Sequence, residues 1–129
     1  MSDLEQFLAL PDVDNLTEDV YVSDRVGTFT IKAMTADDFE DYRRKAGVRA
    51  TKKGTEFNTT RFFLAMIAGQ TIKPDFANKE ILARCGCTTP EQVVSKKLLM
   101  GEITKLANRI QEISGFDNNL DEDIEEAKN

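Results

Sequence analysis

One apolar stripe near the C-terminal end of the chain constrains the fold most. Its members step along the sequence by four, three, four and three residues: Leu99, Ile103, Leu106, Ile110 and Ile113. This spacing places them on one side of an α-helix. Thr89 and Pro90 form a helix-start signal, and Gly115 before Phe116 is typical of a Schellman stop. We therefore expect one helix from Pro90 to about Ser114, the longest in the chain.

Two residues of this helix carry further expectations. Gly101 inside a helix costs about 1 kcal/mol relative to alanine, so we expect another backbone to approach it closely. Phe116 should fold back onto Ile110 or Gln111 at the stop. The stripe itself faces either the protein's own core or a second chain, because both roles require the same pattern.

The N-terminal third predicts a short helix followed by a β-hairpin. Ser2 and Glu5 have capping-box spacing before an apolar run that stops at Pro11. The apolar face of this helix comprises Leu4, Phe7 and Leu8. Two runs typical of strands follow, Glu18–Ser23 and Thr28–Met34, with Gly27 in the connection.

The middle of the chain predicts three more helices. Thr35 caps one that ends at Gly47, and Asn58 or Thr59 caps a strongly apolar one that ends near Gln70. Residues 48–58 predict a basic loop with room for a short edge strand. Residues 71–76 predict an extended segment, and residues 78–86 predict a short helix that ends at glycine. The expected class is α+β: an N-terminal β-hairpin packed with several α-helices on one side, and a long C-terminal helix. Residues 1–116 form the expected single domain, and residues 117–129 an acidic flexible tail.

The residue types present argue against catalysis and metal binding. The chain has no histidine, which removes the common nucleophilic triads and the usual general base near neutral pH. The two cysteines, Cys85 and Cys87, are too close for an unstrained disulfide and too few for a metal site, so we expect reduced thiols. We therefore expect no enzyme, no metal and no cofactor; a metal or redox role of the two cysteines and an enzyme that uses carboxylates are the lesser alternatives.

Charge is unevenly distributed. The net charge is −6, and residues 117–129 hold six acids and one lysine, so the remainder is close to neutral. This tail is either a solvated terminus or an acidic arm that recruits a basic partner. A basic cluster without acids lies in the middle of the chain: Arg43, Arg44, Lys45, Arg49, Lys52 and Lys53. It supports a rival hypothesis of a small nucleic-acid-binding regulator, which the lack of interleaved aromatics disfavours.

The apolar runs are too short to cross a membrane, and the N-terminus carries acids where an export signal carries bases. We therefore expect a cytoplasmic protein that does not contact a membrane.

Three blocks of the sequence resemble the XkdN-like prophage tail-assembly proteins. They are VGTFTIKAMTADDFEDYRRKA, IKPDFANKEILARCGCTTPEQVVSKKLLMGEI and LANRIQEISGFDNNLDEDIEEAKN, and the most characteristic parts are TPEQ, LLMGEI and ISGF. The similarity runs from about residue 17 to residue 129. The CxC at Cys85 and Cys87 is a departure from the family pattern.

This resemblance implies a tail assembly chaperone in the host cytoplasm. Such a protein binds the tape-measure protein, and the tail tube protein is a further candidate partner, before the tube polymerises. It is then absent from the mature particle. The resemblance supplies no contact residues, so those follow from the apolar patterns alone. We expect partner contacts at Leu99, Ile103, Leu106 and Ile110, or else at Leu4, Phe7 and Leu8, and a weak homo-oligomer is a further expectation.

Overall fold

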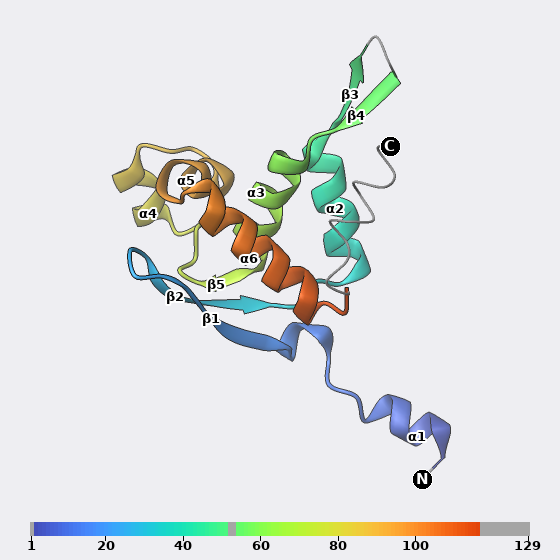
Figure 1. The fold of residues 1–129 in the computed structure, drawn as a ribbon. Helices are drawn as coiled ribbons and strands as arrows, with labels where there is room; N and C mark the ends of the chain where they lie inside the picture. Colours follow the sequence, from blue (N-terminus) through green and yellow to red (C-terminus); the bar gives the residue numbers. More distant parts are fainter. Residues whose placement is uncertain (1, 52–53, 117–129) are drawn as a thin grey trace.

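The computed structural model describes residues 2–51 and 54–116, and for residues 48–51 and 54–57 it describes the backbone alone. A three-stranded antiparallel sheet has the order β1-β2-β5 and is formed by β1 (Thr17–Ser23), β2 (Gly27–Lys32) and β5 (Thr71–Lys73). Helices lie on one side of this sheet (Figure 1). The expected α+β class is confirmed.

The β1–β2 hairpin follows from alternating side chains and one glycine. Val20 pairs with Phe29, and both are buried, while Tyr21 faces outward. Gly27 has a φ of 80°, which lets the chain turn into β2 without strain. The buried face of this hairpin covers the helices and so forms one wall of the core.

The helices begin where cap residues stand. Ser2 accepts a hydrogen bond from the backbone N–H of Glu5 and starts α1 (Asp3–Leu8). Thr35 and Asp38 form a capping box at α2 (Ala36–Ala46), and Asn58 caps α3 (Thr59–Gln70). The remaining helices are α4 (Lys79–Cys85), α5 (Pro90–Lys97) and α6 (Met100–Ile113), and a 3₁₀ turn, η1, spans Val13–Asn15.

Helix α3 is the centre of the core, as its apolar composition predicts. It packs against α2, α5 and α6. Its buried side chains include Met66 and Ile67, which are fully enclosed. Burying one such side chain stabilises the fold by about 1.5–3 kcal/mol relative to leaving it exposed.

Strands β3 (Val48–Thr51) and β4 (Gly54–Phe57) form a two-stranded antiparallel ribbon, which projects from the body (Figure 1). The segment expected to be a basic loop with a short edge strand thus contains two paired strands.

The predicted single helix from Pro90 to Ser114 is wrong. The backbone is extended at Leu98 and Leu99, with ψ values of 143° and 154°, and this break separates α5 from α6. Leu98 turns into the core at the break and is buried. Helix α6 is nevertheless the longest helix of the described residues.

The end of α6 is the expected Schellman motif. The Phe116 N–H donates to the Gln111 carbonyl at 3.0 Å, and the Gly115 N–H donates to the Glu112 carbonyl at 3.1 Å. The Phe116 ring packs against Phe39 of α2, with centroids 5.4 Å apart. The stop therefore also joins α6 to α2.

The expected close approach at Gly101 is wrong, because a Cβ there would meet no atom within 4 Å. The tightly packed helical glycine is Gly69 of α3. A Cβ there would lie 2.0 Å from the Tyr42 hydroxyl oxygen. The predicted acidic tail, residues 117–129, lies outside the described residues.

Candidate partner-binding surface

The apolar stripe of α6 belongs to the core. Ile103 is 4% exposed, Leu106 and Ile110 are 0% exposed, and Ile113 is partly buried. The cause is that α6 packs this side against α3 and β1. Partner contacts at Ile103, Leu106 and Ile110 therefore do not fit this fold, because a partner cannot reach them in the folded domain.

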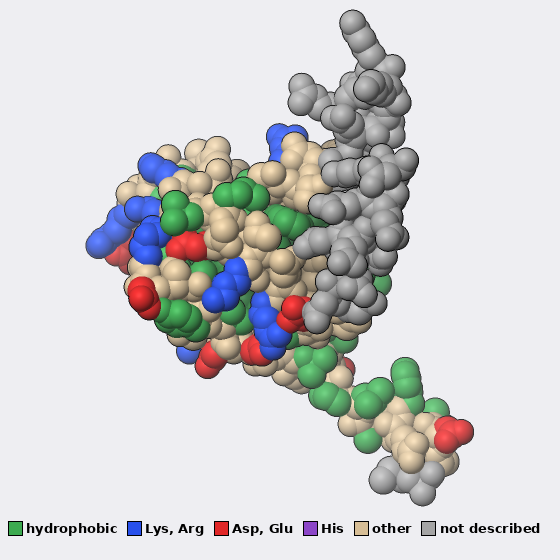
Figure 2. Space-filling view, viewed as in Figure 1, with side chains coloured by type: hydrophobic (Ala, Val, Ile, Leu, Met, Phe, Trp, Pro, Cys, Tyr) green, Lys and Arg blue, Asp and Glu red, His purple; other side chains and the backbone are tan. Residues whose placement is uncertain are grey.

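The N-terminal arm (Ser2–Leu10) has the opposite character. It extends away from the body (Figure 1), and all of its residues are exposed. Four large apolar side chains of the arm are 63–71% exposed: Leu4, Phe7, Leu8 and Leu10. Figure 2 shows apolar side chains along this projecting segment. The first three were predicted from the sequence pattern, and Leu10, two residues beyond the end of α1, is a further exposed apolar side chain.

The arm is tied to the body only after Pro11. The Ala33 N–H donates to the Leu16 carbonyl at 2.9 Å, and Lys32 forms an ion pair with Asp14 at 3.8 Å. These contacts fix η1 and the start of β1 beside the end of β2. The arm is therefore a separate short helix presented from a fixed point.

A second exposed apolar site lies at the junction of α5 and α6. Leu99 is 61% and Met100 51% exposed, directly beside the buried Leu98. Of the predicted stripe, Leu99 is thus the member that faces solvent. Met100 was not predicted, because it lies outside the stripe's spacing.

The backbone at this junction is held by Glu102. Its carboxylate accepts hydrogen bonds from the Leu99 N–H at 2.7 Å and the Ser23 hydroxyl at 2.6 Å, and it pairs with Arg25. These contacts, chiefly those with Arg25 and then Ser23 and the Leu99 N–H, lower the pKa of Glu102 from 4.5 to about 2. Arg25 also donates to the Lys97 carbonyl at 2.8 Å. The β1–β2 turn therefore fixes the direction in which Leu99 and Met100 project.

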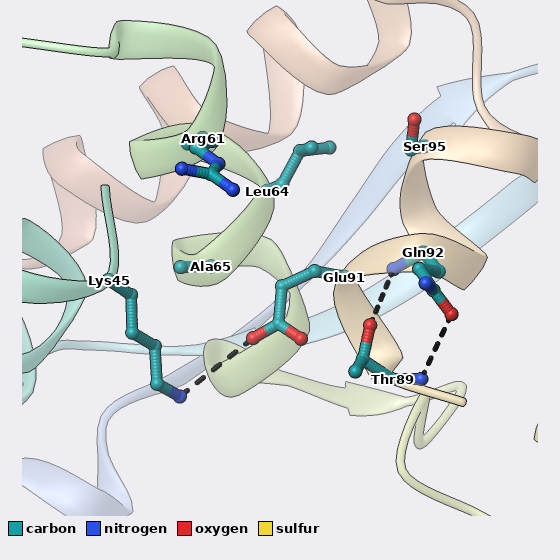
Figure 3. Close-up of a pocket in the computed structure, with 8 residues that line it drawn as sticks. All are labelled: Lys45, Arg61, Leu64, Ala65, Thr89, Glu91, Gln92 and Ser95. Atoms are coloured by element: carbon teal, nitrogen blue, oxygen red, sulfur yellow. Dashed lines mark hydrogen bonds and ion pairs between the residues drawn. The ribbon is translucent and has the colours of Figure 1, made fainter. Parts of the chain in front are cut away.

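A groove lies between the ends of α2, α3 and α5 (Figure 3). Its volume is about 560 Å³, and its apolar floor is formed by Leu64 and Ala65 of α3. Lys45 and Glu91 face each other across it at 3.8 Å. Arg61 lines the same groove and forms no ion pair with another described residue. The lining residues are Lys45, Arg61, Leu64, Ala65, Thr89, Glu91, Gln92 and Ser95.

Sequence reasoning did not find this groove. It is assembled from three helices that are far apart along the chain, and none of its residues belongs to a motif. Arg61 had one weak signal, namely a basic residue in the first turn of a helix, where the dipole disfavours a positive charge.

The described part of the basic cluster is paired with acids. Arg43 contacts Glu40 at 3.4 Å, Arg44 contacts Asp41 at 2.9 Å, and Lys45 contacts Asp41 at 3.6 Å as well as Glu91. These are exposed pairs, typically worth about 0–1 kcal/mol each. They balance the positive charge that a nucleic-acid surface would need to present. The side chains of Arg49, Lys52 and Lys53 lie outside those described.

Cys85 and Cys87 are free thiols and are both partly buried. Among the described residues no group of three or more histidine, cysteine or acidic side chains is arranged to hold a metal ion. No helix in the described part of the chain combines the length and apolar character required to span a bilayer.

Comparison with protein families gives a match over nearly the whole chain. The model for the phage XkdN-like tail assembly chaperone protein matches residues 4–128.

Individual proteins similar to this chain come from Bacillus subtilis (strain 168). The phage-like element PBSX protein XkdN is 27% identical over 106 residues, covering 78% of this chain and 72% of XkdN. The protein YqbN is 30% identical over 104 residues, covering 77% of this chain and 69% of YqbN. A crystal structure of YqbN superposes with a TM-score of 0.69 at 26% identity, covering 91% of this chain and 99% of that one.

Proposed function

Because this chain belongs to the phage XkdN-like tail assembly chaperone family, we propose that it binds the tape-measure protein before the tail tube polymerises. It acts in the host cytoplasm and leaves before the particle matures. It acts by binding, without catalysis or a cofactor. The tail tube protein is the second candidate partner.

The observation that carries this proposal is the N-terminal arm. A helix as short as α1 is marginal in water by itself, so packing of its apolar face against a partner would stabilise it. Leu4, Phe7 and Leu8 share that face, and they are exposed instead of packing against the body of the protein. Exposed contiguous apolar side chains of this kind mark interaction sites.

The binding mode that fits is helix against helix. An amphipathic segment of the tape-measure protein packs on Leu4, Phe7 and Leu8, and burial of apolar surface contributes about 25 cal/mol per Å² before the cost of ordering is subtracted. Leu99 supplies a second apolar contact at the α5–α6 junction. Each copy binds weakly, and many copies cover one long partner.

Co-expression with the tape-measure protein of the same phage tests the proposal. We expect the wild-type chain to keep the tape-measure protein in the soluble fraction and to co-purify with it. A variant carrying Leu4→Ser, Phe7→Ser and Leu8→Ser should lose this ability while its body stays folded. Tyr21→Ser is the matched control, because Tyr21 is an exposed apolar ring on the sheet, away from the arm.

Retention of the tape-measure protein by the triple serine variant would overturn the assignment of the arm. Failure of the wild-type chain to retain it, with the tail tube protein retained in its place, would transfer the proposal to that partner.

A further inference from the structure

From the arm and the groove together we propose that the N-terminal arm of one copy docks into the α2–α3–α5 groove of a second copy. This self-association goes beyond the proposed function, since it requires no other protein. It covers the apolar face of the arm when no tail protein is bound.

The arm combines an exposed apolar face with acidic side chains. Leu4, Phe7 and Leu8 project from one face, and Asp3 and Glu5 in the same helix carry negative charge. No lysine or arginine occurs before Arg25, so every charged side chain of the arm and of the segment that joins it to β1 is acidic.

The groove has the complementary chemistry. Leu64 and Ala65 provide an apolar floor, and the rim carries Arg61, whose guanidinium has no carboxylate partner among the described residues. Lys45 is already neutralised by Glu91 and Asp41. Arg61 is thus the cation that remains to meet Asp3 or Glu5 of an incoming arm.

A second hollow, of about 470 Å³ between α6 and β1, fits the arm less well. Its cations are engaged: Lys105 donates to the Val22 carbonyl at 3.2 Å, and Arg109 pairs with Glu18 and Glu112. Val20 is the only large apolar side chain among its lining residues. Neither the apolar face nor the acids of the arm would find a match there.

The groove lies at the far end of α2 from the point where the arm is anchored. The arm leaves the body beside Ala33, just before α2 begins, whereas Lys45 is one residue from the end of α2. At 1.5 Å per residue, these positions are separated by about 14 Å along the helix. Because the arm also extends away from the body of its own chain (Figure 1), the occupant of the groove is the arm of a second copy.

The contact is small. A stable interface buries roughly 800 Å² on each partner, which one six-residue helix does not reach. The association is therefore weak and reversible, and a tail protein can displace the arm.

Light scattering over a concentration series tests the proposal with the wild type, two variants and a mixture of the two variants. The wild-type mass should rise above 14.5 kDa toward twice that value. Phe7→Asp removes the apolar anchor of the arm, Arg61→Glu reverses the charge of the groove, and each variant alone should stay at the monomer mass. An equimolar mixture of the two should associate again, because it contains one intact arm and one intact groove.

Lys79→Glu is the matched control for the charge reversal, since Lys79 is exposed on α4 outside the groove. It should associate like the wild type. Circular dichroism establishes that each variant is folded, which the exposure of Phe7 and Arg61 favours.

Several results would overturn the proposal: a wild-type chain that stays monomeric, Phe7→Asp that associates normally, Arg61→Glu that associates normally, or a mixture that does not recover association. Binding of the tape-measure protein by Arg61→Glu is a separate readout. If the wild type does not self-associate but the tape-measure protein is still bound, the proposed function stands and only the docking of the arm into a second copy is overturned.

Discussion

Glu102 accepts a hydrogen bond from the backbone N–H of Leu99 at 2.7 Å, and the same carboxylate holds Ser23 and Arg25 of the β1–β2 hairpin. One side chain thus starts α6, because Leu99 has no side-chain acceptor of its own, and also joins α6 to the sheet. Glu102 is only 7% exposed, so its partners within the protein replace water.

Replacing Glu102 should destabilise the fold in proportion to the contacts removed. Glu102→Gln keeps an oxygen that can accept from the Leu99 N–H but loses the charge opposite Arg25, whereas Glu102→Ala loses both. We expect the melting temperature to fall for Glu102→Gln and to fall further for Glu102→Ala, as followed by circular dichroism. Glu40→Gln, in an exposed pair with Arg43, should melt like the wild type.

The same carboxylate predicts a pH dependence. Its pKa is about 2 in the folded protein against an ordinary value of 4.5. The stability it contributes is therefore fully present above pH 4.5 and is lost as the pH falls toward 2. Between pH 4.5 and pH 2, the urea midpoint of the wild type should fall more steeply than that of Glu102→Gln. Parallel curves would contradict the assignment of this carboxylate.

Two helical glycines should respond in opposite directions to alanine. Gly69→Ala forces a Cβ against the Tyr42 ring, so we expect a loss of about 1–3 kcal/mol in the free energy of unfolding. Gly101→Ala meets open space in a helix and should gain about 0.5–1 kcal/mol. Chemical denaturation measures both, and equal effects would show that neither environment is as described.

Leu106 and Leu99 distinguish core from surface within the predicted stripe. Leu106→Ala opens a cavity at a fully buried site and should cost about 2–5 kcal/mol of unfolding free energy. Leu99→Ala, at a mostly exposed site, should change it by about 0.5 kcal/mol or less. Denaturant titrations of both variants check this. A large loss for Leu99→Ala would mean that Leu99 packs inside the domain.

Helix boundaries could be predicted where the chain carries its own cap. Ser2, Thr35, Asn58 and Thr89 each accept a hydrogen bond from the first turn of the helix that they precede. Such contacts span three residues and are therefore visible in the sequence.

The break at Leu98 and Leu99 could not be predicted in the same way. Neither residue is a helix breaker, and the break is stabilised by burial of Leu98 and by Glu102 with Ser23, a residue 79 positions away in the chain. The packing of Gly69 on Tyr42 is likewise a tertiary contact. Local patterns do not encode either.

The candidate surface was predicted in part. The arm's apolar face follows from helical spacing in a segment with its own cap, so Leu4, Phe7 and Leu8 could be named from sequence. The spacing of Ile103, Leu106 and Ile110 is the same whether the helix faces the core or a partner, and only the position of α6 on α3 and β1 decides. The groove around Arg61 could not be predicted, because it exists only once α2, α3 and α5 are packed together.

The most direct measurement is the mass, by size exclusion with light scattering, of the soluble material obtained when this chain is co-expressed with the tape-measure protein. We predict a complex that contains one tape-measure chain and several copies of this protein. A tape-measure protein that stays insoluble while this chain elutes alone would contradict its role as the chaperone of that partner.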